Sequence, residues 1–425
     1  MSNKTGYKMT KIGEIPEDWD LNQLDRLALP QKGAIKIGPF GSQLKKCDLS
    51  TEGIKVYGQE NVMSNDFTLG SRYVSADKFR TLKSVEVFPG DVLVTMMGSL
   101  GFAAVIPEGA PKGIMDSHLL RIRVNRNLVL PKFIALLLRD SDIIKRQIRK
   151  LSQGAIMSGL NSKLVRSFIV PVPHLEEQYK ITSIFSTVDD AIQKIDEIIR
   201  RTQELKKGLM QQLLTKGIGH TKFKQTELGE IPEEWKVAKV GEICKSIVPG
   251  RNKPKKFDGN IPWITLPDIE EIYITSSKSG LKVSREEVKK CGGKIVPPNS
   301  VIMSCIGEFG IVAITTRDLV INQQLHAFIC PENVEPYFLA MALMSQAKYM
   351  HSIATITVVP YLNKDNCNSI PIPIPNISEQ KKIASIFSAM DEKIETEKQR
   401  KEQLEKLKKG LMQDLLTGRV RVKVD

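Results

Sequence analysis

The sequence predicts an α+β or mixed α/β protein. We expect two globular units, each a mixed β-sheet with helices, separated by a pair of long antiparallel coiled-coil helices. Three observations predict this fold. First, several sequence motifs of the 425-residue chain occur in both halves. Second, the two units share the signals of strands and helices although their sequences differ. Third, a proline-free segment in which apolar residues follow heptad spacing comes after each unit. We therefore expect an internal pseudo-twofold repeat.

The repeated segments occur in the same order in both halves of the chain. Thr10–Trp19 (TKIGEIPEDW) recurs as Thr226–Trp235 (TELGEIPEEW). Val170–Pro173 recurs as Ile372–Pro375, and the Glu177-Gln178 that follows the first copy recurs as Glu379-Gln380. Leu205–Thr215 (LKKGLMQQLLT) recurs as Leu407–Thr417 (LKKGLMQDLLT). Chance does not produce matches of this kind, so the chain is an internal duplication.

The long stretches between these segments, roughly 20–170 and 236–372, share a skeleton. Val92–Gly101 aligns with Val301–Gly310, and in both a run of buried-strand residues leads into a Gly-x-x-Gly turn. An amphipathic helix that starts with proline comes next, at Pro131 in the first unit and at Pro336 in the second. We expect one scaffold whose loops carry different side chains.

A long helix follows each unit, over about residues 176–214 and 379–416. At ~1.5 Å per residue each helix is roughly 55–60 Å long. The heptad spacing predicts that the two helices pack together and hold the two units at opposite ends. The expected helix-pairing residues are Ile181, Phe185, Val188, Ile192, Ile195, Ile199, Leu209, Leu213, Ile383, Phe387, Met390, Ile394, Leu404, Leu411 and Leu415.

Five polar residues occupy seam positions where apolar residues are expected: Thr202, Lys206, Glu397, Lys401 and Lys408. Such residues can fix the register of a coiled coil at some cost in stability. The alternative is that the helix ends fray or curve apart, and the sequence leaves both interpretations open. The expected segments are the first unit over 1–172, the first helix over 173–216, a linker and the second unit over 217–374, and the second helix and tail over 375–425.

Charge and composition indicate the class of partner. Lys and Arg number 62 against 48 Asp and Glu, which gives a formal charge of +14, and 41% of the residues are hydrophobic. A folded protein with this excess favours a polyanion such as nucleic acid. The sequence has neither a long apolar run nor a secretory leader, so we expect a soluble cytoplasmic protein. Six scattered cysteines without a CxxC pair predict neither a zinc site nor disulfides.

Catalytic motifs are absent from the sequence, with one pattern to weigh. There is no phosphate-binding G-x-x-x-x-G-K-[ST] loop, no G-x-G-x-x-G turn and no H-E-x-x-H pair. Asp268, Glu287 and Lys289 resemble the carboxylate and lysine set of metal-dependent nucleases. The first unit has Asn61 at the position of Asp268, which counts against a catalytic role. A metal-dependent DNA nuclease and a coiled-coil adaptor without a nucleic-acid role remain the alternatives.

Each unit carries a glycine- and lysine-rich loop shortly after its tryptophan repeat, over 32–46 and 249–256. Exposed backbone amides and flexible cations suit phosphate oxygens. Base edges require Arg, Lys, Asn or Gln at suitable positions. The predicted DNA-binding residues are Lys32, Lys36, Ser42, Gln43, Lys45, Gln59, Asn61, Arg72, Ser99 and Arg121 in the first unit, and Arg251, Asn252, Lys253, Lys255, Lys256, Gln323, Gln324, Tyr361 and Asn363 in the second.

Taken as a set, the repeated motifs resemble the specificity subunit of type I restriction-modification systems over nearly the whole chain. They are G-E-I-P-E-x-W at Gly13–Trp19 and Gly229–Trp235, G-P-F-G-S at Gly38–Ser42, the duplicated P-x-P and E-Q segments, and the closing L-K-K-G-L-M-Q stretches. The second unit departs from the family pattern, because it has Val248–Asn252 (VPGRN) in place of G-P-F-G-S.

The resemblance implies a non-catalytic DNA-binding subunit of a restriction system. It implies two target recognition domains, each reading one half of a split site in double-stranded DNA, and a helix pair that sets the spacer and docks two methyltransferase (modification) subunits. Those partners would methylate adenine with S-adenosylmethionine. Restriction (motor-nuclease) subunits would add ATP-dependent cleavage that uses Mg²⁺. By this resemblance the chain itself binds no cofactor or metal and contacts no membrane.

Overall fold

The computed structural model describes residues 6–97, 101–152, 161–250, 252–356 and 358–423. Contacts divide the chain into two compact parts. Unit 1 comprises residues 1–194 and 400–425, and unit 2 comprises residues 195–399. This division differs from the consecutive segments expected from the sequence, because each unit includes part of both long helices. Packing, and not chain order, decides which residues form a unit.

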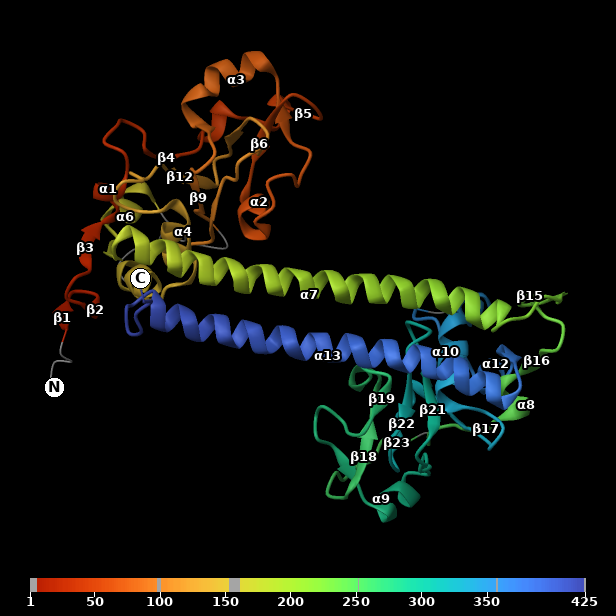
Figure 1. The fold of residues 1–425 in the computed structure, drawn as a ribbon. Coiled ribbons are helices and arrows are strands. Elements are labelled where there is room, and N and C mark those ends of the chain that lie inside the picture. Colours follow the sequence, from red (N-terminus) through yellow and green to blue (C-terminus); the bar gives the residue numbers. More distant parts are fainter. Residues whose placement is uncertain (1–5, 98–100, 153–160, 251, 357, 424–425) are drawn as a thin grey trace. The chain divides into compact units, whose positions relative to one another are not determined.

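Unit 1 contains several small sheets that are mostly antiparallel (Figure 1). A hairpin joins β1 (Tyr7–Thr10) to β2 (Gly13–Pro16), and β3 (Asp20–Gln23) pairs with β13 (Ile169–Val172). The next sheet has the order β10 (Ala103–Val105), β9 (Val92–Thr95), β12 (Leu119–Ile122), β4 (Ile35–Ile37). The last has the order β5 (Leu49–Ser50), β7 (Tyr73–Val74), β6 (Ile54–Tyr57), β11 (Gly113–Met115), β8 (Glu86–Val87).

Unit 2 repeats this plan. The hairpin is β14 (Phe223–Thr226) with β15 (Gly229–Pro232), and β16 (Lys236–Lys239) pairs with β25 (Pro371–Ile374). One sheet has the order β17 (Lys245–Ile247), β24 (Leu325–Ile329), β21 (Ser300–Ser304), β22 (Val312–Thr315), β19 (Tyr273–Ile274). The other has the order β20 (Lys282–Val283), β18 (Ile261–Ile264), β23 (Val320–Ile321). The fold is therefore the predicted duplication.

Short helices connect these strands. In unit 1 they are α1 (Leu24–Leu27), α2 (Gln59–Ser64), α3 (Ala76–Leu82), α4 (Pro131–Asp140), α5 (Asp142–Ser152) and α6 (Ser162–Ser167). In unit 2 they are α8 (Val240–Ile243), α9 (Arg285–Lys290), α10 (Pro336–Ser345), α11 (Ala347–Ile353) and α12 (Lys364–Asn368). Proline stands in the first turn of α4 and α10, where its missing N–H costs no intrahelical bond. Both helices start with proline as predicted. The prediction that both are amphipathic is wrong for α10, because every residue from Tyr337 to Leu343 is buried and the helix has no polar face there.

The repeated Trp and Glu-Gln motifs join each unit to its helix by the same bonds. Trp19 Nε1 donates to Glu177 Oε2 at 2.9 Å, and Trp235 Nε1 donates to Glu379 Oε2 at 3.0 Å. Both tryptophans lie in the main hydrophobic core of their unit. A buried indole N–H needs an acceptor, and the glutamate at the start of the long helix supplies it. This explains why the two motifs are repeated together.

The long helices are α7 (Leu175–Lys216) and α13 (Ile377–Leu415), and they pack together (Figure 1). In unit 1 the start of α7, with Ile181 and Phe185, shares a core with Leu415 at the end of α13. In unit 2 the end of α7, with Leu213, shares a core with Phe387 near the start of α13. The pairing is therefore antiparallel within each unit. Each predicted helix-pairing residue is buried or half-buried.

Two of the polar seam residues form ion pairs between the helices. Lys206 Nζ on α7 lies 2.5 Å and 2.6 Å from the two carboxylate oxygens of Asp391 on α13. Lys408 Nζ on α13 lies 2.6 Å from Asp189 Oδ1 on α7. The same pair therefore occurs once in each unit. At these two lysines the helices stay in contact, which agrees with polar seam residues that fix the register and disagrees with helix ends that fray or curve apart.

Within the described ranges, none of the helices is both long enough and apolar enough to span a membrane.

Candidate nucleic-acid interface

In unit 2, three loops that are far apart in sequence meet at one end of the sheet. Cys305 N, just after β21, donates to Gln324 O at 2.9 Å, just before β24. Gln323 Nε2 donates to Gly250 O at 3.3 Å, in the loop after β17. These loops, together with residues 362–364, surround a hollow of about 260 Å³. We call this the unit 2 reading surface. It includes Gln323, Gln324 and Asn363 from the sequence prediction.

The corresponding loops meet in unit 1. Met96 N, just after β9, donates to His118 O at 2.9 Å, just before β12, and Gly38 N donates to Leu119 O at 2.9 Å. Gly38 approaches closely, since a Cβ at this position would lie 1.8 Å from Asp116 O. Only glycine fits there without moving the backbone. These loops, with the adjoining turn at Gly58–Asn61, form the unit 1 reading surface.

The basic loop of unit 2 is held by a carboxylate. Lys255 N and Lys256 N both donate to Glu287 Oε1, at 2.6 Å and 3.3 Å. Lys253 Nζ lies 5.4 Å from the centre of the Trp263 ring, within cation–π range. The side chains of Asn252, Lys253, Lys255 and Lys256 are exposed. A loop whose backbone is held in this way and whose lysine side chains are exposed is suited to phosphate contacts.

The predicted cations of unit 1 lie near its own loop. Lys32 and Lys45 are exposed and Lys36 is half-buried. Burial, together with the nearby charges of Arg121 and Lys32, lowers the pKa of the Lys36 ammonium. Ser42 and Gln43 are exposed, and Gln43 Oε1 accepts a hydrogen bond from Phe40 N at 3.2 Å. The bond uses the oxygen of the Gln43 amide, and the two N–H donors of that group have no partner among the described residues.

Asn61 and Arg121 correct the prediction. Asn61 is fully buried, and its side chain accepts from Gly58 N at 2.9 Å and donates to Asp66 O at 3.0 Å and to Leu69 O at 2.8 Å. Arg121 is 2% exposed and donates to Glu86 O and to Gly33 O. Burial lowers the pKa of Arg121 to about 10. Neither side chain reaches the surface, so both support the loops and are withdrawn as base contacts.

The remaining candidates differ in their exposure and in the hydrogen bonds that they already make within the chain. Asn363 is exposed, but its Oδ1 accepts from Asn366 N at 2.8 Å and caps α12, as Asn161 caps α6 in unit 1. Tyr361 is exposed and pairs through its backbone with Thr355. Gln59 is half-buried at the start of α2. Ser99 and Arg251 lie outside the described residues.

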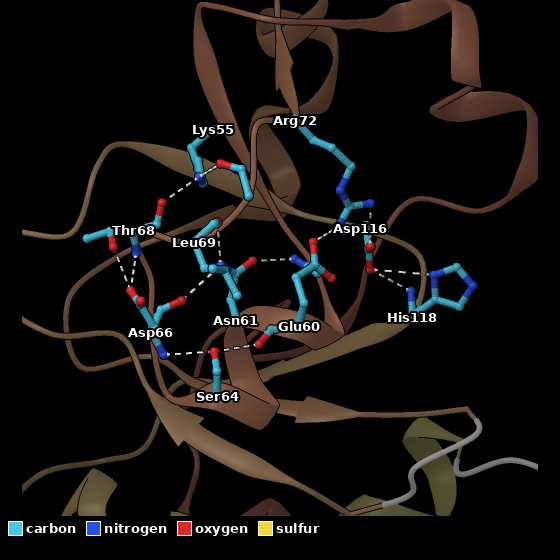
Figure 2. A network of polar contacts seen from close by, with 12 residues as sticks. Lys55, Glu60, Asn61, Ser64, Asp66, Thr68, Leu69, Arg72, Asp116 and His118 are labelled. Atoms are coloured by element: carbon cyan, nitrogen blue, oxygen red, sulfur yellow. Dashed lines mark hydrogen bonds and ion pairs between the residues drawn. The ribbon is translucent and has the colours of Figure 1, made fainter. Parts of the chain in front are cut away.

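Arg72 stands in a polar network on the unit 1 reading surface (Figure 2). Its NH2 group lies 2.6 Å from Glu60 Oε1 and its NH1 group lies 3.1 Å from Asp116 Oδ2. Burial opposes the charge of Arg72, but the two carboxylates outweigh it and raise the pKa of the guanidinium above its usual value. Asp116 Oδ1 also accepts from His118 N at 2.9 Å. The sequence prediction missed Glu60, Asp116 and His118, since nothing in their spacing links them to Arg72.

Helix α5 adds a basic face that the prediction also missed. It buries Ile143 and Ile144 and exposes Lys145, Arg146, Arg149 and Lys150. Apolar residues on one side and cations on the other are visible in the sequence DIIKRQIRKLS, so a search for basic amphipathic helices would have found them. Such a face suits contact with a phosphate backbone.

The carboxylates of the nuclease alternative serve as loop supports. Asp268 accepts from Thr265 N at 2.7 Å, Thr265 Oγ1 at 2.7 Å and Lys278 N at 2.8 Å. Burial alone would raise the pKa of Asp268, but these donors outweigh it and lower the pKa. Glu287 holds the basic loop. Within the part of the chain that the structure describes, no group of three His, Cys, Asp or Glu residues is arranged to hold a metal ion.

Comparison with known proteins points to a single family. The model of the type I restriction modification DNA specificity domain matches residues 35–206 and again residues 232–406. A putative type I restriction enzyme MjaX specificity subunit from Methanocaldococcus jannaschii is 31% identical, over 98% of this chain and 97% of that protein. The MjaVIII specificity subunit of the same organism is 29% identical, over 96% of this chain and 94% of that protein.

Two solved structures share the fold. A chain from a study of assembly and conformational transition of the type I R-M system has a TM-score of 0.53 at 18% identity, and covers 96% of this chain and 99% of that chain. The S subunit of a type I restriction-modification system from M. genitalium has a TM-score of 0.56 at 14% identity, and covers 96% of this chain and 97% of that chain. At these identities the likeness concerns the fold.

Proposed function

Because the chain belongs to the family of type I restriction-modification DNA specificity subunits, we propose that its two reading surfaces each recognise one half of a split site in double-stranded DNA. The family is non-catalytic and recognises DNA on behalf of methyltransferase and restriction subunits. Neither the nuclease nor the adaptor alternative gains support from the relatives of this chain. The proposal therefore concerns which part of this chain recognises which half of the DNA site.

One observation carries the proposal: the two reading surfaces share their backbone and differ in their side chains. The bond from Met96 N to His118 O in unit 1 has its counterpart in the bond from Cys305 N to Gln324 O in unit 2, both at 2.9 Å. The side chains on these loops nevertheless differ, as with His118 and Gln324. A common scaffold with unlike donors and acceptors reads two unlike sequences.

The exposed cations would position the DNA. They include Lys32 and Lys45 in unit 1, the Lys253–Lys256 loop in unit 2, and the basic face of α5. Each phosphate that they neutralise releases counterions, so DNA affinity should fall steeply with salt concentration. Base identity would then be decided by the polar side chains of the reading surfaces.

The helix pair would set the spacer between the half-sites and dock two methyltransferase subunits. Those partners would use S-adenosylmethionine to methylate adenine, and restriction subunits would use ATP and Mg²⁺, while this chain would bind none of these. We place the assembled complex in the cytoplasm. The proposal rests on family membership and on the antiparallel packing of α7 and α13 within each unit.

Exchange of one recognition segment tests the proposal. Replacing residues 20–170 by the corresponding segment of another specificity subunit should change one half of the methylated sequence and leave the other half as before. The measurement is sequencing of methylated adenines in a host that expresses the chain with its methyltransferase partner. Exchange of residues 236–372 is the matched control and should change only the other half. Methylated sites that stay the same in both exchanges would contradict the proposal.

A further inference from the structure

We infer that Arg72 and Glu60 together read a G·C base pair in the half-site of unit 1. This inference rests on the proposed function and adds a base identity to it. Arg72 would donate to guanine O6 and N7, and Glu60 would accept from the N4 amino group of the paired cytosine. These are the contacts that guanidinium and carboxylate groups make best in the major groove.

The two side chains form a ready-made pair at the surface. Arg72 NH2 and Glu60 Oε1 are 2.6 Å apart, and the side chains are 35% and 42% exposed. A guanidinium has five N–H donors, and the bonds to Glu60 and Asp116 use one each. Donors therefore remain for a base edge, while Glu60 has a second carboxylate oxygen to accept from one. Opposite charges side by side match a G·C pair, which offers acceptors on guanine and a donor on cytosine.

The buried Asp116 carboxylate fixes the orientation of the Arg72 guanidinium. Its side chain is only 8% exposed and accepts from Arg72 NH1 at 3.1 Å. Its other oxygen accepts from His118 N at 2.9 Å, so the carboxylate is fixed by the turn that precedes β12 (Figure 2). An arginine whose orientation is fixed before binding loses less side-chain entropy on contact with a base.

Gly58 makes room for the guanidinium. A Cβ on Gly58 would lie 1.8 Å from Arg72 NH2 and 2.3 Å from Glu60 Oε2. The Arg72 and Glu60 side chains therefore lie directly against the backbone at this position. Gly58 N donates to the buried Asn61 side chain at 2.9 Å, and this bond ties the turn under the pair to the interior of the unit.

Unit 2 has neither Arg72 nor Asp116 at the equivalent positions, as expected if these charged side chains determine specificity. Val56 N donates to Arg72 O at 2.9 Å in unit 1, and Trp263 N donates to Leu281 O at 3.0 Å in unit 2. Leu281 thus replaces Arg72. Asp116 N donates to Tyr57 O, and Asn322 N donates to Ile264 O, both at 2.9 Å. Asn322 therefore replaces Asp116, and the scaffold does not require the charges.

The test uses the chain assembled with its methyltransferase partner. First, the methylated sites of the wild-type complex are sequenced, and the 20–170 exchange identifies the half-site of unit 1. That half-site should contain a G·C pair at which Arg72→Gln loses its preference, while the other half-site stays unchanged. Arg80→Gln is the matched control, since Arg80 is an exposed arginine of the same unit whose partner is Asp77 at 2.8 Å.

A second measurement changes the DNA as well as the chain. Replacing the guanine by 7-deazaguanine removes the N7 acceptor and should weaken binding of the wild-type complex by about tenfold. The same change should have little further effect on the Arg72→Gln complex. Glu60→Ala should relax the preference at the same base pair and at no other position.

Two results would overturn the inference while leaving the proposed function intact. One is a unit 1 half-site without a G·C pair, and the other is an Arg72→Gln complex whose two half-sites match the wild type. A wild-type complex that methylates no split site would instead overturn the proposed function, and this inference with it.

Discussion

Single residues show how the two units diverge on one scaffold. Leu119 on β12 pairs with Thr95 on β9, and Leu325 on β24 pairs with Ser304 on β21 in the same way. The next residues, Leu120 in unit 1 and His326 in unit 2, are therefore equivalent. His326 is 2% exposed, and its Nε2 has no hydrogen-bond partner within the described residues. Burial lowers the pKa of His326 to about 4. A buried neutral histidine links the stability of unit 2 to pH.

The substitution His326→Leu should remove that link. Between pH 6.5 and pH 4 the unfolded chain binds a proton at this histidine and the folded chain does not, so wild-type stability falls as pH falls. From pH 6.5 to pH 4.5 the loss amounts to roughly 2–3 kcal/mol, by the conversion of ~1.36 kcal/mol per pKa unit. Urea unfolding of the full chain at several pH values measures the difference between variant and wild type.

Phe328→Leu, two residues along the same strand, provides the control for the pH experiment. It should lower stability by a similar amount at every pH, because it removes buried apolar contact and no titrating group. If His326→Leu also differed from the wild type by a constant amount at all pH values, the buried histidine would not be the source of the slope.

At the scale of elements, the two long helices combine apolar packing with two partly buried ion pairs, Lys206–Asp391 and Lys408–Asp189. Lys206 and Asp391 have side chains that are 16% and 25% exposed, so water screens them only in part. Tyr337 on α10 also donates to Asp391, which connects the ion pair to the globular part of unit 2. In unit 1, Arg139 lies 3.8 Å from Asp189 and makes a similar connection.

Breaking one member of the Lys206–Asp391 pair should destabilise the chain more than breaking both. Lys206→Met leaves a partly buried carboxylate without its cation, which costs roughly 1–3 kcal/mol. Lys206→Met combined with Asp391→Leu should recover a good part of that loss. A double-mutant cycle by chemical unfolding measures the coupling free energy.

The pair Arg200–Glu204 provides the matched control for this cycle. It lies on the same helix, and its side chains are 59% and 64% exposed. An exposed pair at this spacing should show a coupling of only about 0.3–0.5 kcal/mol. Equal coupling in the two cycles would argue against a special role of the seam ion pair.

At the scale of the whole molecule, the proposed function assigns the spacer to the helix pair. Because α7 and α13 are antiparallel, the ion pair of Lys206 with Asp391 places Thr202 near Ile394 on the opposite helix. An insertion in one helix alone therefore leaves its new residues without a partner. Insertion into both helices preserves the heptad pattern on each side.

A heptad inserted after Thr202 and a second heptad inserted after Ile394 should lengthen the spacer of the methylated site. Seven residues add roughly 10 Å of helix at ~1.5 Å per residue, which corresponds to about three base pairs at ~3.4 Å each. Both half-sites should keep their sequence. Sequencing of methylated adenines reads the spacer and the half-sites together.

The matched control carries only one of the two insertions. It should reduce or abolish methylation, because the apolar seam on one side of the insertion loses its register. A doubly extended chain that still methylates sites with the original spacer would show that the helices do not set it.

The sequence by itself determined the duplication, the two long helices and the lysines of the seam. These features are written in local or periodic signals: repeated motifs, proline at a helix start, and apolar residues every seventh position. Such signals need no knowledge of the contacts between distant residues. They were enough to predict the fold class and the family, whereas the DNA contacts stay a prediction.

Only the tertiary structure decided which of the candidate polar side chains are buried and which are exposed. Asn61 and Arg121 have the residue types that read bases, yet packing buries them, while it leaves Gln323 exposed. It also brings Arg72 to Glu60 and Asp116, which no spacing in the sequence connects. Burial and partners depend on the whole packed arrangement, because a polar group inside a protein must find its hydrogen bonds among residues that the chain order keeps far apart.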